Sequence, residues 1–179
     1  LNSDNLTTLQ MFDVAIIGGG PGGYVAAERA GAAGLSVVLF ERKSLGGVCL
    51  NEGCIPTKTL LYGAKVYNYA VNGDHYGVYA QNPSFNYGEF VKRKDKVVKK
   101  LVGGIKAAMK GYKVQVVSES ATIKGRSADG IEIVAGSESY LCRNLLVCTG
   151  SEAAVPPFPG LKEAAEVIVT NREILALQE

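Results

Sequence analysis

The sequence is poor in the residues from which metal sites and disulfide scaffolds are built. It contains one histidine and four cysteines among 179 residues. Only Cys49 and Cys54 lie close together, so the ligands of a tetrahedral zinc site are missing and we expect no metal site. Four cysteines in a chain of this length do not make a disulfide scaffold, so we expect a reducing, cytoplasmic setting. In that setting a close cysteine pair is catalytic or metal-binding, and the missing ligands favour a catalytic pair.

Long apolar runs and a strong charge of one sign are also missing. No stretch reaches the length of a membrane-spanning helix, and the start lacks the charged and apolar regions of a signal peptide. The formal net charge is only +2, which argues against a nucleic-acid or anionic-membrane partner. The basic run at 92–96 is expected to be the solvated face of a helix.

The chain is rich in glycine and in apolar residues. Apolar residues make up 47%, enough for the core of one domain with appendages, and 22 glycines predict many tight turns. A buried strand is predicted at 12–17, a helix of small residues at 22–33 and a second strand at 36–40. This strand–helix–strand order is a βαβ unit, whose crossover is almost always right-handed.

The later segments predict two longer helices and then a change of period to two. The helices are expected at 57–70 and 87–110, with a loop at 72–86 between them. Short strands are expected at 113–117, 121–123, 131–134, 139–142, 145–148 and 167–169, and a final helix from Asn171. Cys142 and Cys148 lie on these strands, where small apolar core residues are expected.

The predicted fold class is therefore α/β, with a central parallel sheet and an additional small antiparallel β-meander. We expect residues 1–10 to be a linker or remnant, 11–151 to be one domain, and 152–179 to be a connection.

A G-x-G-x-x-G pattern at Gly18, Gly20 and Gly23 lies between the first predicted strand and helix. The first glycine permits a tight turn, the second lets a pyrophosphate approach the backbone, and the third lets the helix pack on the strand. Glu41 ends the second strand, where a carboxylate can bind ribose hydroxyls and disfavours a 2′-phosphate. The pattern favours a dinucleotide site over a glycine-rich turn without a ligand, and so predicts that 11–151 is a Rossmann-like nucleotide-binding domain. It does not separate FAD from NAD.

Cys49 and Cys54 are five positions apart. A helix rises about 7.5 Å over five residues, whereas a disulfide needs Cα atoms closer than about 7 Å. Pairing would therefore need a turn or a distorted helical turn, which Gly53 permits. So small a ring would stabilise the fold by only about 2 kcal/mol, which favours redox exchange over a structural role. The following helix would stabilise a Cys54 thiolate, and Lys58, otherwise a plain solvated lysine, could add positive charge.

These segments together resemble a known family. Residues 13–41 and 46–58 resemble the FAD fingerprint and the redox-active disulfide of the pyridine nucleotide-disulfide oxidoreductases. Cys148-Thr149-Gly150-Ser151 resembles the family's threonine–glycine motif. By this resemblance Cys49 is the interchange thiol that forms a mixed disulfide with substrate, and Cys54 is the charge-transfer thiol. The residues that the resemblance implies in FAD binding are Gly18, Gly20, Gly22, Gly23, Glu41, Arg42, Gly47, Lys58, Ala121, Thr149, Gly150 and Ser151.

Within the family, the segments 50–53 and 55–58 are most similar to members that oxidise dihydrolipoamide. The resemblance then implies that dihydrolipoamide is oxidised through a Cys49–Cys54 disulfide and FAD, with reduction of NAD⁺. The implied partner is a lipoyl domain of a 2-oxo acid dehydrogenase or glycine cleavage complex. Alternatives are an enzyme of the glutathione or mercuric reductase type, and a non-catalytic nucleotide-binding module that senses redox state through its thiols.

Family members are homodimers with an NAD-binding domain and an interface domain that supplies a histidine general base. The sequence has no second G-x-G-x-x-G, and its one histidine, His75, is expected in a surface loop. We therefore expect an N-terminal part of such an enzyme that does not turn over by itself.

Overall fold

The computed structural model describes residues 10–161 and 163–178, and these form two compact units. The first unit runs through Gly47 and resumes over Gly104–Gly150. The second unit comprises Val48–Gly103 and the chain from Ser151 onward. Most of the predicted linker at 1–10 lies outside the described residues.

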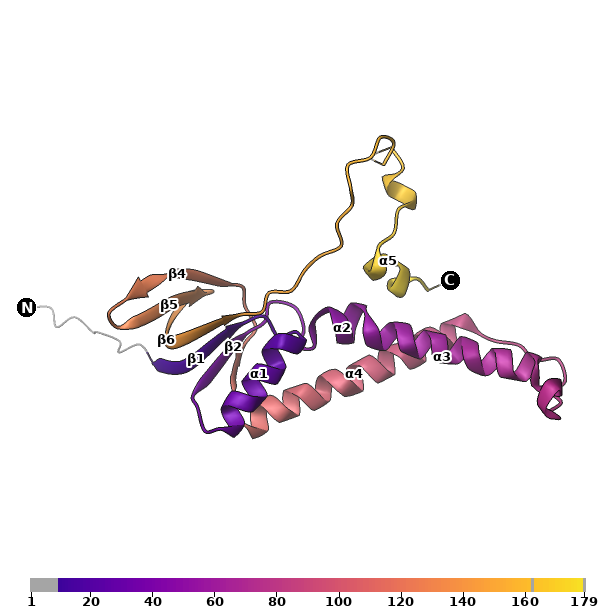
Figure 1. Ribbon diagram of the computed structural model, residues 1–179, viewed down its shortest axis with the longest axis horizontal. Coiled ribbons are helices and arrows are strands. Elements are labelled where there is room, and N and C mark those ends of the chain that lie inside the picture. Colours follow the sequence, from indigo (N-terminus) through magenta and orange to yellow (C-terminus); the bar gives the residue numbers. More distant parts are fainter. Residues whose placement is uncertain (1–9, 162, 179) are drawn as a thin grey trace, which may run out of the picture. The chain divides into compact units, whose positions relative to one another are not determined.

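One six-stranded sheet forms the centre of the first unit (Figure 1). Its strands are β1 (Met11–Ile17), β2 (Val37–Phe40), β3 (Gln115–Val117), β4 (Ala121–Ser127), β5 (Gly130–Ala135) and β6 (Glu138–Val147). The order is β3-β2-β1-β6-β5-β4; β3, β2, β1 and β6 are parallel, while β6, β5 and β4 are antiparallel. The predicted α/β class with a parallel sheet and a meander is confirmed, and the meander continues the same sheet.

The βαβ unit at the start of the chain is formed as predicted. Helix α1 (Pro21–Ala32) connects β1 to β2, and Pro21 occupies its first turn, where its missing N–H would lack a helical partner in any case. At the other end of the unit, Asp13 and Ser36 fasten the starts of the two strands. The Asp13 carboxylate accepts hydrogen bonds from the backbone N–H and the hydroxyl of Ser36, at 2.9 and 2.7 Å. These bonds lower the pKa of Asp13.

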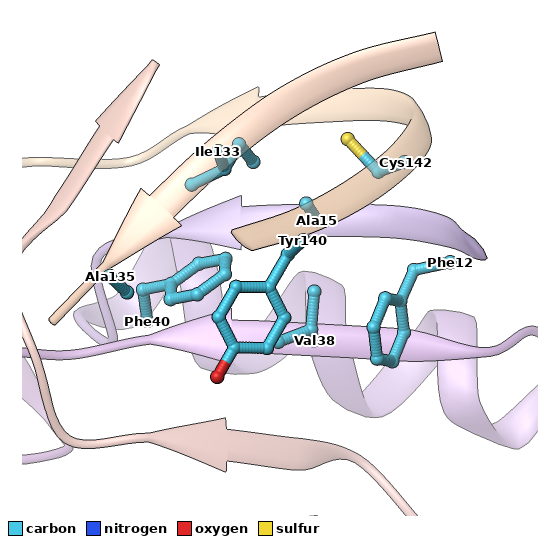
Figure 2. Close-up of a cluster of buried hydrophobic side chains, with 8 residues drawn as sticks. All are labelled: Phe12, Ala15, Val38, Phe40, Ile133, Ala135, Tyr140 and Cys142. Carbon is cyan, nitrogen blue, oxygen red and sulfur yellow. The ribbon is translucent and has the colours of Figure 1, made fainter. Parts of the chain in front are cut away.

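Two buried clusters hold the sheet, one on each face. The first comprises Phe12, Ala15, Val38, Phe40, Ile133, Ala135, Tyr140 and Cys142 (Figure 2). The second comprises Ile16, Ala27, Val37, Leu39, Leu45, Met109 and Val114. All four residues of β2 are buried, and they alternate between the two clusters, as expected for a strand covered on both faces. Burying a side chain of this size contributes about 1.5–3 kcal/mol.

The second unit is mainly helical. Its helices are α2 (Gly47–Glu52), of which only Gly47 belongs to the first unit, α3 (Cys54–Val71), the 3₁₀ turns η1 (Gly73–Tyr76) and η2 (Ala165–Val167), and α5 (Asn171–Ala176). Helix α4 (Tyr87–Gly111) crosses from the second unit into the first at the pair Gly103 and Gly104. Helix α3 and the first part of α4 run side by side (Figure 1), and an added Cβ at Gly63 would lie 3.1 Å from the Phe90 ring.

Several predicted boundaries were wrong for identifiable reasons. The helix predicted from 57 begins at Cys54, because Pro56 is tolerated in a first helical turn. The strands predicted at 139–142 and 145–148 are one strand, β6, which pairs with β5 in its first half and with β1 from Leu141 onward. The predicted strand at 167–169 is wrong: Val167 ends a 3₁₀ turn and is 80% exposed.

The basic run at 92–96 was predicted to face solvent, and Lys94 is an exception. Its side chain is buried, and its Nζ donates a hydrogen bond of 2.9 Å to the carbonyl oxygen of Leu175. In the described part of the chain, none of the helices combines the length and the apolar character that crossing a bilayer requires.

Candidate functional site

The glycine turn between β1 and α1 depends on close backbone contacts. Gly18 has a φ of 105°, and a Cβ added there would lie 2.2 Å from the carbonyl oxygen of Cys148. A Cβ on Gly23 would lie 1.7 Å from the carbonyl oxygen of Gly18. Neither position has space for a larger residue, so the first and third glycines of the pattern are required by the fold itself.

Gly20 and Gly22 are different, because the protein leaves space beside them. The nearest atom to an added Cβ is the Gly47 Cα at 3.7 Å for Gly20, and the Cys148 Sγ at 3.6 Å for Gly22. Gly20 is the residue before α1, and within the described residues no side chain caps that helix start. A helix start lined by bare backbone is the kind of surface to which a pyrophosphate can come close.

The loop that follows β2 is fastened onto this turn. The Glu41 carboxylate accepts hydrogen bonds from the backbone N–H of Gly19 at 2.8 Å and of Lys43 at 2.7 Å. The Gly46 N–H donates to the carbonyl oxygen of Gly19 at 2.8 Å. Gly47, with a φ of 56°, lies so close that an added Cβ would be 2.6 Å from the Gly20 Cα. A carboxylate oxygen can accept more than one hydrogen bond, so Glu41 keeps the capacity to bind hydroxyls.

A hollow lies beside Glu41 in the first unit. Its lining residues are Glu41, Lys43, Ser44, Leu45, Lys106, Met109, Lys110, Val114, Val116 and Ser118. Leu45, Met109 and Val114 are buried and give the hollow an apolar floor, whereas its three lysines are exposed. The hollow therefore combines apolar surface with positive charge next to a carboxylate.

The carboxyl ends of β1, β2 and β6 meet at the glycine turn. The Gly18 N–H donates to the carbonyl oxygen of Phe40 at 2.8 Å, and the Cys148 N–H donates to that of Ile17 at 2.7 Å. Thr149 and Gly150 follow directly from β6. In open α/β sheets, ligands bind at the carboxyl edge where neighbouring strands connect in opposite directions, and the β2-β1-β6 order provides such a point.

The cysteine pair lies in the second unit. Cys49 is on α2 and half-buried, Cys54 is the first residue of α3 and exposed, and Gly53 separates the two helices. The helix is therefore interrupted between the cysteines, which is the backbone form that a pairing of the two would require. The neighbouring Cys54 thiol together with burial raises the pKa of Cys49, while Lys58 opposes the rise. All four cysteines are free thiols, and Cys142 and Cys148 contribute to the core clusters, as predicted.

The predicted site residues divide between the two units. Those in the first unit are Gly18, Gly20, Gly22, Gly23, Glu41, Arg42, Gly47, Ala121, Thr149 and Gly150, and those in the second are Cys49, Cys54, Lys58 and Ser151. The structure joins the glycine turn to Glu41 and Gly47, whereas Ala121 begins β4 and packs against the first core cluster. Sequence reasoning missed the backbone groups of Gly19, for which the run of three glycines was the only signal.

Comparison with known proteins decides the family. Residues 12–179 match the model of the family described as pyridine nucleotide-disulphide oxidoreductase. The chain belongs to this family. The dihydrolipoyl dehydrogenase of Acholeplasma laidlawii is 44% identical over 167 residues, which are 92% of this chain and 48% of that protein. The dihydrolipoyl dehydrogenase of Chlorobaculum parvum is 44% identical over 171 residues, which are 94% of this chain and 36% of that protein.

A solved structure shares the fold. It is a Cu(II) complex of the HOCl-induced flavoprotein disulfide reductase RclA from Escherichia coli, with a TM-score of 0.72 at 24% identity. The match covers 93% of this chain and 34% of that one. The chain thus spans about half or less of the proteins that it matches. The predicted resemblance to the family is confirmed, and membership implies a flavin cofactor. The open space at Gly20 and the bare start of α1 fit the pyrophosphate of FAD.

Proposed function

We propose that this chain is the FAD-binding, dithiol-bearing part of a dihydrolipoyl dehydrogenase. The observation that carries the proposal is the placement of Cys49 on α2 and of Cys54 at the first residue of α3, on either side of the break at Gly53. A close pair of this kind can exchange two electrons with another dithiol without a metal. The curated relatives named above, which carry that enzyme's name, support the choice of substrate.

The residues that would hold FAD follow from the glycine turn and from Glu41. The glycine turn would receive the pyrophosphate at Gly20, with the amides of α1 as donors, and Glu41 would accept hydrogen bonds from the ribose hydroxyls. We assign the remaining contacts to Gly18, Gly22, Gly23, Arg42, Gly47, Lys58, Ala121, Thr149, Gly150 and Ser151. The hollow beside Glu41 suits the adenine end, because it offers an apolar floor. The chemistry that bound FAD supplies is acceptance of two electrons.

The dithiol would act by thiol–disulfide exchange. When Cys49 and Cys54 are joined as a disulfide, a thiolate of dihydrolipoamide attacks the Cys49 sulfur. The Cys49–Cys54 bond breaks, and Cys54 leaves as a thiolate. The second lipoyl thiol then attacks the sulfur that is bound to Cys49, so that lipoamide leaves oxidised and both cysteines are reduced. The start of α3 and the charge of Lys58 stabilise the Cys54 thiolate as it leaves. Each exchange conserves the number of sulfur–sulfur bonds.

The remaining functions belong to a protein of the relatives' length. We propose NAD⁺ as the final acceptor, a homodimer as the assembly, and a lipoyl domain of a 2-oxo acid dehydrogenase or glycine cleavage complex as the partner. We place this activity in the cytoplasm. We assign residues 152–179 to the connection toward the NAD-binding domain.

The proposal is tested on the chain itself. We expect that the oxidised chain, mixed with dihydrolipoamide, yields free thiols at Cys49 and Cys54, detected by alkylation and peptide mass spectrometry. Reduced glutathione at the same thiol concentration is the comparison, and Cys142→Ser is the control variant because its thiol is buried. The proposal fails if dihydrolipoamide leaves the pair unreduced, or if glutathione reduces it equally fast.

A further inference from the structure

Glu52 lies between the two proposed redox cysteines and is held by residues about 120 positions later in the chain. The Arg172 Nε donates a hydrogen bond to the Glu52 carboxylate, and the Asn171 side-chain amide donates one of 2.8 Å to the Glu52 carbonyl oxygen. The short loop between Cys49 and Cys54 is thus fixed through both its main chain and a side chain. All of these contacts lie within the second unit.

The residues that hold Glu52 are themselves anchored. Thr170 and Glu173 form a capping box at the start of α5. Near the end of α5, the buried Lys94 donates a hydrogen bond to the carbonyl oxygen of Leu175. The side chains of Arg172 and Glu52 are only 30% and 32% exposed, so water screens their ion pair less than it screens a surface pair. An anchored helix therefore presents Asn171 and Arg172 to the loop.

The held residue is next to the flexible point of the loop. Glu52 is the last residue of α2, and Gly53 alone separates it from Cys54, the first residue of α3. Glycine has the largest conformational freedom of any residue, so without further contacts Gly53 would let the two helices rotate against each other. Fixing the Glu52 carbonyl oxygen, which belongs to the peptide group before Gly53, restricts that rotation.

We infer that Asn171 and Arg172 are positioning residues for the dithiol, which act by holding Glu52 so that Cys49 and Cys54 stay within reach of each other. This inference rests on the proposed redox function of the pair. It extends that function to a segment near the end of the chain, far in sequence from the cysteines.

The consequence is measurable in an exchange with glutathione disulfide. Cys49 attacks glutathione disulfide and forms a mixed disulfide, releasing one glutathione. Cys54 then attacks the Cys49 sulfur, forming the Cys49–Cys54 bond and releasing the second glutathione, and the two protein protons end on the two released thiols. The second step depends on the effective concentration of one thiol near the other, which a fixed loop raises.

The test compares variants of the 179-residue chain in glutathione redox buffers. Samples are quenched with acid, alkylated, and measured by mass spectrometry for the dithiol, the mixed disulfide and the Cys49–Cys54 disulfide. Arg172→Ala is expected to lower the equilibrium constant for disulfide formation about three- to tenfold and to increase the mixed disulfide. Glu152→Gln is the matched control, because it removes the other ion pair of Arg172, at 3.2 Å, and leaves the Glu52 contact in place.

A further variant separates positioning from general stability. Glu52→Gln keeps a hydrogen-bond acceptor but removes the charge, so a smaller change is expected, and its effect should not add to that of Arg172→Ala. If Arg172→Ala has the wild-type equilibrium constant for disulfide formation and the wild-type circular dichroism spectrum, this inference is overturned. The proposed function is not affected by that outcome. If Arg172→Ala loses its helical signal, Glu52→Gln decides, and unchanged constants there overturn the inference. A wild-type chain that never forms the Cys49–Cys54 disulfide would overturn the proposed function as well.

Discussion

The glycines of the turn differ in how much space the protein leaves for a side chain, although the sequence pattern does not distinguish them. Gly18 and Gly23 face backbone carbonyl oxygens at distances that no Cβ can occupy. Gly20 faces open space, with only the Gly47 Cα at 3.7 Å. The fold therefore requires glycine at the first and third positions. At the second position the protein itself leaves room for a side chain, so glycine there serves the approach of a ligand.

Gly20→Ala and Gly23→Ala should separate these two demands. We expect Gly23→Ala to lower the free energy of unfolding by about 3 kcal/mol or more, because the new methyl group overlaps the carbonyl oxygen of Gly18. Gly20→Ala should change it by less than about 1 kcal/mol. It should nevertheless weaken FAD binding at least about tenfold, or about 1.4 kcal/mol, because the methyl group occupies the approach to the pyrophosphate. Urea denaturation and flavin fluorescence titration measure the two effects.

Gly103→Ala is the control, since an added Cβ there meets no atom within 4 Å. It should leave flavin affinity unchanged and stabilise α4 slightly. Equal flavin affinity in Gly20→Ala and the wild type would contradict the assignment of Gly20 to the pyrophosphate.

Residue identities were predictable where the signal is local. The spacing of Gly18, Gly20 and Gly23 and the position of Glu41 at the end of a strand are readable from neighbouring residues. The burial of Lys94 was not, because its partner Leu175 is 81 positions away. The contact between Arg172 and Glu52 was also not predicted, because the two residues are far apart in the sequence. Both are charged and lie in segments whose composition is typical of a surface.

At the scale of elements, β6 joins the two parts of the sheet. It pairs antiparallel with β5 and parallel with β1, and both pairings overlap near Cys142. Tyr140 lies on β6 in the first core cluster. The centroids of its ring and the Phe40 ring are 5.1 Å apart, and the rings pack edge to face (Figure 2). Its hydroxyl donates a hydrogen bond of 2.6 Å to the Glu138 carboxylate. This bond, with burial, raises the pKa of Tyr140 to about 12.

Tyr140→Phe tests the pH dependence that follows. The pKa in the folded state is raised above its usual value of 10.0, so the neutral hydroxyl stabilises the fold fully below about pH 10. That contribution is lost as the pH rises toward about 12. We expect Tyr140→Phe to cost about 1 kcal/mol near pH 7, a value discounted for the exposure of Glu138.

The difference between wild type and Tyr140→Phe should therefore shrink between about pH 10 and 12 in urea denaturation. Tyr112→Phe is the control, because Tyr112 is 40% exposed and should follow the wild-type curve. A constant difference between wild type and Tyr140→Phe across this range would show that the hydroxyl does not contribute in this way.

Elements were predictable where a pattern repeats over several residues, as in the βαβ unit and α4. The continuity of β6 was missed because Arg143 and Asn144 interrupt the apolar alternation, although Asn144 pairs with Val14 on the neighbouring strand. The apolar run at 167–169 misled the prediction in the opposite direction. Such a run forms a strand only when another strand is available to pair with it.

At the scale of the whole molecule, the chain spans 48% and 36% of the two dihydrolipoyl dehydrogenases compared above. It contains a dithiol and a dinucleotide turn, and its one G-x-G-x-x-G lies in the first unit. Oxidation of a lipoyl dithiol with NAD⁺ also needs a nicotinamide site and a general base within hydrogen-bond reach of the thiols. The single histidine, His75, lies in the 3₁₀ turn after α3 and is exposed, as its loop position predicted.

We therefore expect that this chain, soaked with FAD, does not reduce NAD⁺ with dihydrolipoamide. The same sample should still exchange its Cys49–Cys54 disulfide with dihydrolipoamide, because that step needs only the two thiols. Absorbance of NADH measures the first reaction, alkylation and mass spectrometry measure the second, and a full-length dihydrolipoyl dehydrogenase serves as the positive control. Turnover that disappears in Cys54→Ser would contradict this expectation, because it would place a complete electron path inside 179 residues.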